Sequence, residues 1–224
     1  MIAFDTPQTV FGIDVDLCQH DKKVAIKIVD LAELRVEETS KAFSKQHDLF
    51  KQNDWQLIHV LSSELATKPS IVESRVNYIL HGTTEKVSAR SCKVELLKSK
   101  VACNFLNVSH IQGSGRSKFH FGLIDITGRI VMVMSVSPAR FHPTAKLELI
   151  RVSSLQGVSV VGGASKLLAA VKNQFPNQSI VSYADRRWST GKLYEQLGFK
   201  LENISPACYW YFRPEDTTKL WHRS

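Results

Sequence analysis

The 224-residue chain lacks most features that mark membrane, secreted or zinc-binding proteins. Its 4 cysteines are far apart and form no CxxC pair, which argues against a zinc site and against a disulfide framework. No apolar run approaches the ~18 residues of a membrane span, and the first residues lack the basic start and apolar centre of a signal peptide. Repeats, low-complexity tracts and heptads are also absent. These absences favour a cytoplasmic globular protein with no membrane partner.

Charge is distributed unevenly along the chain. Residues 1–85 carry 9 basic and 13 acidic side chains, whereas residues 86–224 carry 20 and 8. The excess positive charge of the whole chain, +8, therefore lies entirely in its second part. A phosphate polymer such as DNA is the partner expected for this part, and the plainer alternative is a basic solvated surface.

The stretch from Val160 to Phe199 has the pattern of a ligand site. Small residues separate an apolar run from a helical pattern, and they are Gly162, Gly163, Ala164 and Ser165, followed by Lys166. Such a turn leaves uncrowded N–H groups at a helix start, where an anion such as a pyrophosphate is favoured. A tight strand-to-helix connection without a ligand is the alternative. A strand over 179–183 then leads to Asp185, and Ser189 is expected to cap a short helix that ends at Gly198.

This order of parts resembles the GNAT acyltransferase fold. In that family a Q/R-x-x-G-x-G/A turn holds the pyrophosphate of acyl-CoA, and Ser159, Gly162 and Ala164 take its three positions here, so the first position departs from the pattern. The segment LYEQLGF matches the later motif, in which Tyr194 takes the place of the tyrosine that protonates the departing thiolate. The resemblance implies an acyl-CoA-type donor on residues 162–166.

The residues before the glycine-rich turn supply other candidates. A hairpin is predicted from residues 119–126 and 130–136, and a further strand from residues 147–152. Alternation predicts that Glu148 and Arg151 on that strand lie on opposite faces, so only one of them can point into a shared pocket. Glu148 is a candidate general base, and a surface charge is the alternative. In the preceding polar loop, His110 and Gln112 are candidates for substrate contact.

A basic and aromatic cluster follows Asp185. Arg186, Arg187 and Trp188 together suit a nucleic acid, because guanidinium groups hold the backbone while the indole stacks on a base. Core packing is the alternative for Trp188. The nucleic-acid contacts expected on this basis are Arg186, Arg187, Trp188, Arg140, Arg151 and Gln112.

A second resemblance covers about residues 92–212. The runs FLNVSHIQG, FHFGL, LELIR, VVGGASKLL and SYADRRWSTGKLYEQLGF are similar, in this order, to the carboxyl half of phage-encoded Vsr-like homing endonucleases. This implies a DNA-acting protein of a phage or mobile element, located in the host cytoplasm. A weaker likeness of SYAD to the Mom DNA-modification enzyme of phage Mu implies that Asp185 is catalytic.

The same resemblance assigns residues 1–88 to a small Vsr-like, PD-(D/E)XK-like domain. Its frame is recognisable in a strand over residues 55–60, a helix over residues 68–80 and a strand over residues 89–94 that leads into the second domain, but its active-site positions are altered. Asp16 matches the family aspartate, while Lys27 and the pair Glu33 and Leu34 replace a glutamate and a Trp-His pair. Phe43 and Gln46 likewise replace a histidine and a lysine. A lysine at a metal-ligand position repels the ion, so the resemblance implies a degenerate nuclease domain.

The predicted fold class is therefore α/β (α+β): this degenerate domain is followed by a GNAT-like domain over residues 89–224. Three functions stay open. The first is a DNA-acting acyltransferase that uses Glu148, Asp185, His110 and Tyr194. The second is a nuclease that binds Mg²⁺ or Mn²⁺ through Asp14, Asp16, Asp30 and Glu33. The third is a non-catalytic module that binds DNA through its basic half and a protein partner through its acidic half.

Overall fold

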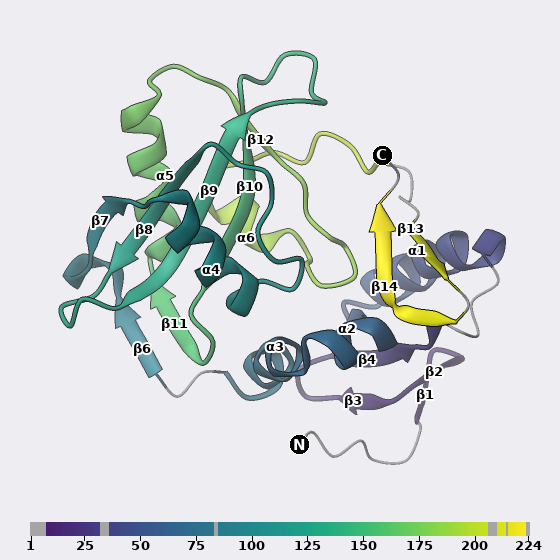
Figure 1. Ribbon diagram of the computed structural model, residues 1–224. Coiled ribbons are helices and arrows are strands. Elements are labelled where there is room, and N and C mark those ends of the chain that lie inside the picture. Colours follow the sequence, from purple (N-terminus) through teal and green to yellow (C-terminus); the bar gives the residue numbers. More distant parts are fainter. Residues whose placement is uncertain (1–7, 32–35, 83–84, 206–209, 214, 223–224) are drawn as a thin grey trace. The chain divides into compact units, whose positions relative to one another are not determined.

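The computed structural model describes residues 8–31, 36–82, 85–205, 210–213 and 215–222. The chain forms two compact units of mixed α/β structure (Figure 1). Unit 1 comprises residues 1–76, 185–192 and 201–224, and unit 2 comprises residues 77–184 and 193–200. This division differs from a contiguous boundary at residue 88, because two carboxyl-terminal segments pack with the amino-terminal residues. No described helix combines the length and the apolar character that crossing a membrane requires.

Unit 1 is built around a three-stranded sheet. Its elements are β1 (Gln8–Val10), β2 (Ile13–Val15), β3 (Leu17–Gln19), β4 (Val24–Val29), α1 (Val36–Gln52), β5 (Gln56–Leu61), α2 (Ser62–Thr67), the first part of α3 (Pro69–His81), β13 (Trp210–Arg213) and β14 (Asp216–His222). The sheet order is β3-β4-β5, with β4 parallel to β5, and α1 supplies the fully buried Phe50 to its core. The expected strand over 55–60 and helix over 68–80 are confirmed.

Unit 2 contains a five-stranded sheet of order β12-β10-β9-β8-β7. Its elements are β6 (Glu85–Ser88), β7 (Lys93–Leu96), α4 (Ser99–Ser109), β8 (Phe119–Ile124), β9 (Ile130–Pro138), β10 (Leu147–Ser154), β11 (Val158–Val161), α5 (Gly163–Gln174), β12 (Ile180–Ser182) and α6 (Lys192–Gln196), whose first residue belongs to unit 1. The predicted hairpin is β8 and β9, and the predicted strand over 147–152 is β10. The segment 89–94 instead starts as a single 3-10 turn, and β7 begins only at Lys93.

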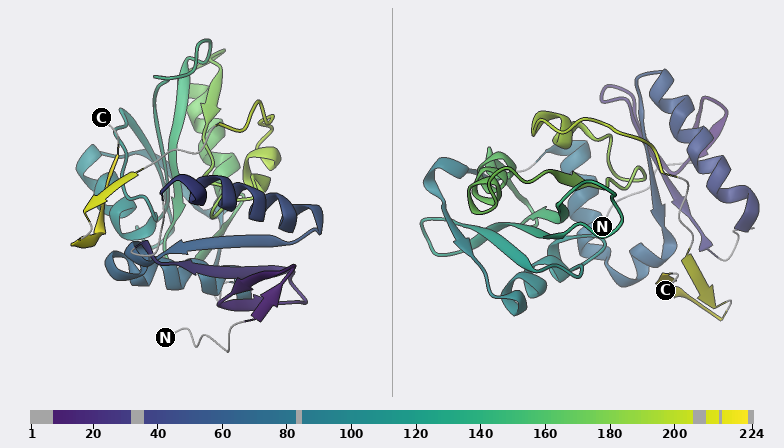
Figure 2. Two further views of the ribbon diagram at one scale, coloured as in Figure 1. Left: turned by 90° about the vertical axis from the view of Figure 1, so that its right-hand side faces the viewer. Right: turned by 90° about the horizontal axis from the view of Figure 1, so that it is seen from above.

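The two faces of this sheet are covered by different helices. Alternate residues of β9, Met132, Met134 and Val136, point to the face on which α5 packs, and they form the main core with Leu167 and Val171. The intervening Val133 points to the other face and packs against α4. Figures 1 and 2 show α5 and α4 on opposite sides of the sheet. All neighbouring strands are antiparallel except β10 and β12, which are parallel.

Candidate functional site

A cavity lies at the start of α5, where the sequence predicts an anion site. Strands β6 and β11 pair in parallel, so the loops that follow them leave the same edge. A cavity of about 690 Å³ lies there, and it is lined by residues at the ends of the two strands, in the loops and in α5, namely Ser88, Ala89, Arg90, Val161, Gly162 and Lys166. Gly162 is the residue before the helix, and no side chain caps the first amides of α5. The N-terminal N–H groups of α5 therefore lie beside an open space.

The two glycines of the turn have different roles. Gly162 has φ +76°, a left-handed conformation that L side chains rarely adopt. A Cβ on Gly163 would lie 2.6 Å from Met132 Sδ and 2.8 Å from Val160 Cγ1, so this glycine permits close packing of α5 on the sheet. Ala164 is also buried in this packing, whereas Ser165 is exposed. The glycine-rich turn thus serves helix packing as well as the cavity.

The two basic residues of the cavity differ in what they contact. Lys166 Nζ donates to the carbonyl oxygens of Ala89 at 2.8 Å and Cys92 at 2.7 Å, and so fixes the loop after β6. Arg90 is exposed, and its side chain has no partner among the described residues. Arg90 is consequently the cation of this cavity that can meet a ligand.

The second part of the site is a polar strip on the α4 side of the sheet. The register of β10 against β9 shifts between Leu149 and Arg151, because Ile150 is an extra residue that forms a bulge. One inserted residue reverses the alternation, so Glu148 and Arg151 lie on the same face. The expectation that they lie on opposite faces is wrong for this reason.

Buried hydroxyl and imidazole groups continue this strip across β9 and β8. In the register of the sheet, Arg151 pairs with Ser135 and Ser135 with His120, while Glu148 pairs with Ser137. His120 Nδ1 lies 2.8 Å from Ser135 Oγ. Both side chains are buried, and His120 Nε2 is a buried atom without a partner in the described chain. Burial lowers the pKa of His120, which keeps the imidazole neutral at pH 7.

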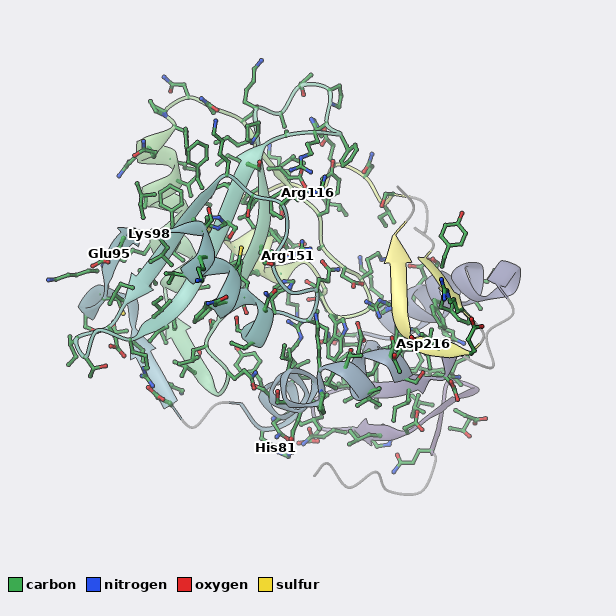
Figure 3. All side chains as sticks on the ribbon, in the orientation of Figure 1. His81, Glu95, Lys98, Arg116, Arg151 and Asp216 are labelled. Atoms are coloured by element: carbon green, nitrogen blue, oxygen red, sulfur yellow. The ribbon has the colours of Figure 1, made fainter. Side chains whose placement is uncertain are left out.

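Arg151 is held at the centre of the strip by its own loop contacts. Its Nε donates to the carbonyl oxygen of Gly113 at 3.1 Å and its Nη1 to that of Ile150 at 2.7 Å. Burial lowers its pKa, and the nearby Tyr194 and Glu148 act in the opposite direction. These three candidates therefore share one neighbourhood in unit 2. Figure 3 shows Arg151 on β10 and Arg116 in the loop before β8.

The loop candidates His110 and Gln112 have local roles. The backbone N–H of His110 closes α4 by donating to Leu106, and its Nδ1 accepts the backbone N–H of Gln112 at 3.1 Å. The Gln112 side chain is exposed. Tyr194 lies on α6, where its ring meets Phe199 edge to face at 5.7 Å. The serine expected to cap this helix, Ser189, instead accepts the N–H of Gly191.

Asp185 and the arginines after it belong to unit 1, where they form ion pairs. Arg187 Nη2 donates to Asp185 Oδ2 at 2.8 Å and to Glu64 Oε1 at 3.1 Å. Arg186 pairs with Asp48 at 2.7 Å. Two of the guanidinium groups expected to contact DNA, those of Arg186 and Arg187, are therefore engaged with carboxylates of unit 1, and Asp185 stabilises its own turn. The burial of Arg187 lowers its pKa, but the two carboxylates outweigh this and raise it overall.

Trp188 follows this ion-pair network in the sequence and is buried. Only 4% of its surface is exposed, and the Arg75 guanidinium carbon lies 4.8 Å from the centroid of its ring. Its ring is therefore not accessible to a stacking base in this structure. Of the two roles considered for Trp188, burial favours core packing.

Two neutral histidines lie in the same unit. His59 is fully buried, its Nδ1 is 3.2 Å from His47 Nε2, and its Nε2 is 2.9 Å from Gln46 Oε1. Phe43 stacks on the His59 ring at 4.3 Å. Burial is the main cause that lowers the pKa of His47 to about 4 and that of His59 to about 3. The charge of Arg186 lowers the pKa of His47 further, and His47 lowers the pKa of His59 further.

This pair predicts that acid destabilises unit 1. In the unfolded chain both histidines take up protons near pH 6.5, whereas the folded pair stays neutral until about pH 4. The free energy of unfolding should therefore fall as pH decreases from 7.5 to 5.5. Urea unfolding of His47→Gln should show a smaller fall, while His81→Gln, a change at an exposed histidine, should retain the wild-type dependence. An unchanged slope in His47→Gln would contradict this assignment.

The nuclease residues do not form a metal centre in the described part of the chain. Asp16 accepts the N–H of Ile28 at 2.6 Å and Asp14 accepts the Thr9 hydroxyl at 2.8 Å. The Ser62 hydroxyl lies 3.4 Å from Asp30. Within residues 8–31, 36–82, 85–205, 210–213 and 215–222, no group of three or more His, Cys, Asp or Glu side chains is placed to hold a metal ion. Glu33 and Leu34 lie outside the described residues.

Comparison with known proteins gives loose structural likenesses alone. No family model matches the chain, and no curated protein does. Among solved structures, a putative acetyltransferase from Deinococcus radiodurans R1 is similar with a TM-score of 0.40 and 12% identity, covering 60% of this chain and 97% of that one. The histone acetyltransferase HPA2 and related acetyltransferase from Corynebacterium glutamicum is similar with a TM-score of 0.31 and 20% identity, covering 59% and 79%. Both proteins are named as acetyltransferases, but likenesses this loose carry no functional argument.

Proposed function

We propose that unit 2 is a GNAT-like acyltransferase that takes its acyl group from a CoA-type donor. The single observation that carries the proposal is the combination, in one unit, of an open helix start beside Arg90 and a polar strip that contains Glu148. The N-terminal amides of α5 and the Arg90 guanidinium suit the two charges of a pyrophosphate.

The edge of β10 offers a path between these two parts. β12 pairs only with Leu147–Leu149, and it ends at Ser182. Beyond Leu149, β10 continues to Ser154 with no described strand on its outer edge. An extended donor arm with amide groups can hydrogen-bond to such an edge as an added strand does. Along the chain this edge lies between Glu148 and the Gly162 turn.

The proposed reaction is a direct transfer. The acceptor nucleophile attacks the thioester carbonyl carbon, and its proton passes to the Glu148 carboxylate. The C–S bond breaks, and the thiolate sulfur takes the proton of the Tyr194 hydroxyl. Arg151, on the same face as Glu148, stabilises negative charge that develops on the carbonyl oxygen. Asp185 has no step, because it is paired with Arg187 in unit 1.

Donor binding is tested by one charge placed at the cavity. Ser165 is exposed in the first turn of α5, so Ser165→Asp should leave the helix intact or stabilise it through the helix dipole. The same carboxylate should repel a pyrophosphate and weaken acetyl-CoA binding by at least about tenfold in calorimetry. Ser165→Asn has nearly the same shape without the charge and should bind almost as the wild type. If the wild-type protein binds no acetyl-CoA, or if both variants bind equally, the proposal is wrong.

A further inference from the structure

We propose that one end of the unit 2 sheet binds single-stranded nucleic acid. The surface, called the cationic end below, consists of Arg116, Lys118, Arg140, Phe141 and Lys146. The bound single strand is also the proposed acceptor of the acyl group, and this role rests on the proposed function. The binding itself is independent of that reaction.

Topology brings the cationic end together. β8 starts at Phe119 beside Val136 of β9, and β10 starts at Leu147 beside Pro138, so the loops before β8 and after β9 leave the sheet at the same end. Arg140 Nη2 joins the two loops by donating to the carbonyl oxygen of Arg116 at 3.1 Å. The loop between β9 and β10 extends beyond the sheet in Figure 1.

The charge of this end is not compensated. Its four cations, Arg116, Lys118, Arg140 and Lys146, are exposed, and none forms an ion pair with another described residue. Unit 2 as a whole contains 14 basic and 5 acidic residues. Two of those acids, Glu85 and Asp125, pair with Arg129 at the other end of the sheet. A polyanion would therefore be attracted to the cationic end.

An exposed aromatic ring distinguishes this end from a merely basic surface. Phe141 is 83% exposed, and it lies in a loop that is held by hydrogen bonds from its own backbone N–H groups. Ala139 N–H donates to Lys146 at 3.0 Å, and the Ala145 N–H donates to His142 Nδ1 at 2.9 Å. Phe141 is thus presented on a structured loop beside Arg140. Base stacking on such a ring, with cations holding the backbone, is the binding mode of single strands.

The same features disfavour two other polyanionic partners. A duplex buries the faces of its bases, so it would use the four cations but not the Phe141 ring. A membrane surface requires a broad apolar face beside the cations, and Phe141 is the one large exposed apolar side chain of this loop. Both partners remain outcomes that the experiment can detect.

Fluorescence anisotropy with the full chain tests the proposal. The probes are a labelled mixed-sequence DNA single strand, its blunt duplex, and vesicles that contain phosphatidylserine. With four phosphate contacts, single-strand affinity should fall about 50-fold between about 50 mM and about 200 mM salt. Phe141→Ala should weaken single-strand binding by about 5- to 160-fold with the salt slope unchanged. The double variant Arg116→Ala and Arg140→Ala should lower that slope instead.

The control removes the same charge elsewhere in unit 2. Lys86 and Lys93 are exposed, and Lys93 pairs with Ile124 at the opposite end of the sheet. Their double alanine variant should bind the single strand nearly as the wild type does. Equal losses in both double variants, an unaltered affinity in Phe141→Ala, or preference for the duplex or the vesicles would each overturn the proposal. Acetyl-CoA binding by the same variants separates this result from the proposed transfer, since the cationic end takes no part in donor binding.

Discussion

Glu148→Gln is expected to slow acyl transfer by about 10²- to 10⁴-fold, the usual range for loss of a general base. An amide keeps the size of the carboxylate but cannot accept the acceptor proton. Because Glu148 is on the polar strip and does not line the cavity, acetyl-CoA binding should be nearly unchanged. The two effects together place the loss in the chemical step.

Free thiol released from acetyl-CoA is the measurement, with a single-stranded oligonucleotide, simple amines or water as acceptors. Glu95→Gln is the matched control, since Glu95 is an exposed residue of β7 and the change removes the same charge from unit 2 (Figure 3). The control should react at the wild-type rate. A Glu148→Gln enzyme that also keeps the wild-type rate would remove Glu148 from the mechanism and leave the base to be sought elsewhere on the strip.

Local features of the fold could be predicted from the sequence because they depend on neighbouring residues. The hairpin of β8 and β9 follows from two β-rich runs separated by Thr127-Gly128, and α5 follows from the apolar spacing after Gly162. Each of these patterns depends only on residues that are close together in the sequence. The order of β8, β9, β10, α5, β12 and α6 was therefore predictable.

The bulge at Ile150 had no such local signal. No glycine or proline marks it, and it is recognised only from the register against β9. Its consequence is large, because it moves Arg151 to the face of Glu148. The pairing of β6 with β11 is similarly hidden, since it joins short strands about 70 residues apart in sequence, and it builds the cavity wall that contains Arg90.

Long-range ion pairs were equally invisible to pattern reasoning. Arg187 contacts Glu64 at a separation of 123 residues, and Arg186 contacts Asp48 at a separation of 138. A run of two arginines and a tryptophan has the composition of a nucleic-acid contact. Only the fold shows that carboxylates of unit 1 engage the two arginines of this run, whereas the four cations of the cationic end form no ion pair with a described residue.

Trp188→Ala is expected to lower the free energy of unfolding by about 3–5 kcal/mol, the range for removing a large buried aromatic side chain. Only 4% of the surface of Trp188 is exposed. In the alanine variant, Arg75 would lose the ring whose centroid lies 4.8 Å from its guanidinium carbon. Burial lowers the pKa of Arg75, which means that burial disfavours its charged form. Losing the ring that attracts this charge therefore adds to the loss of stability caused by the cavity. Urea unfolding monitored by far-UV circular dichroism measures the change.

Two further variants show whether burial is the cause. Trp188→Phe keeps most of the apolar volume and also removes the indole N–H, which is buried without a partner in the described chain, so its loss of stability should be much smaller than that of alanine. Tyr183→Ala removes an aromatic ring that is 53% exposed and should change stability by no more than about 0.5 kcal/mol. If Trp188 were instead a stacking residue for nucleic acid, its alanine variant would unfold like the wild type and lose single-strand affinity. The burial of its ring predicts the reverse: a less stable protein whose folded fraction binds the single strand as the wild type does.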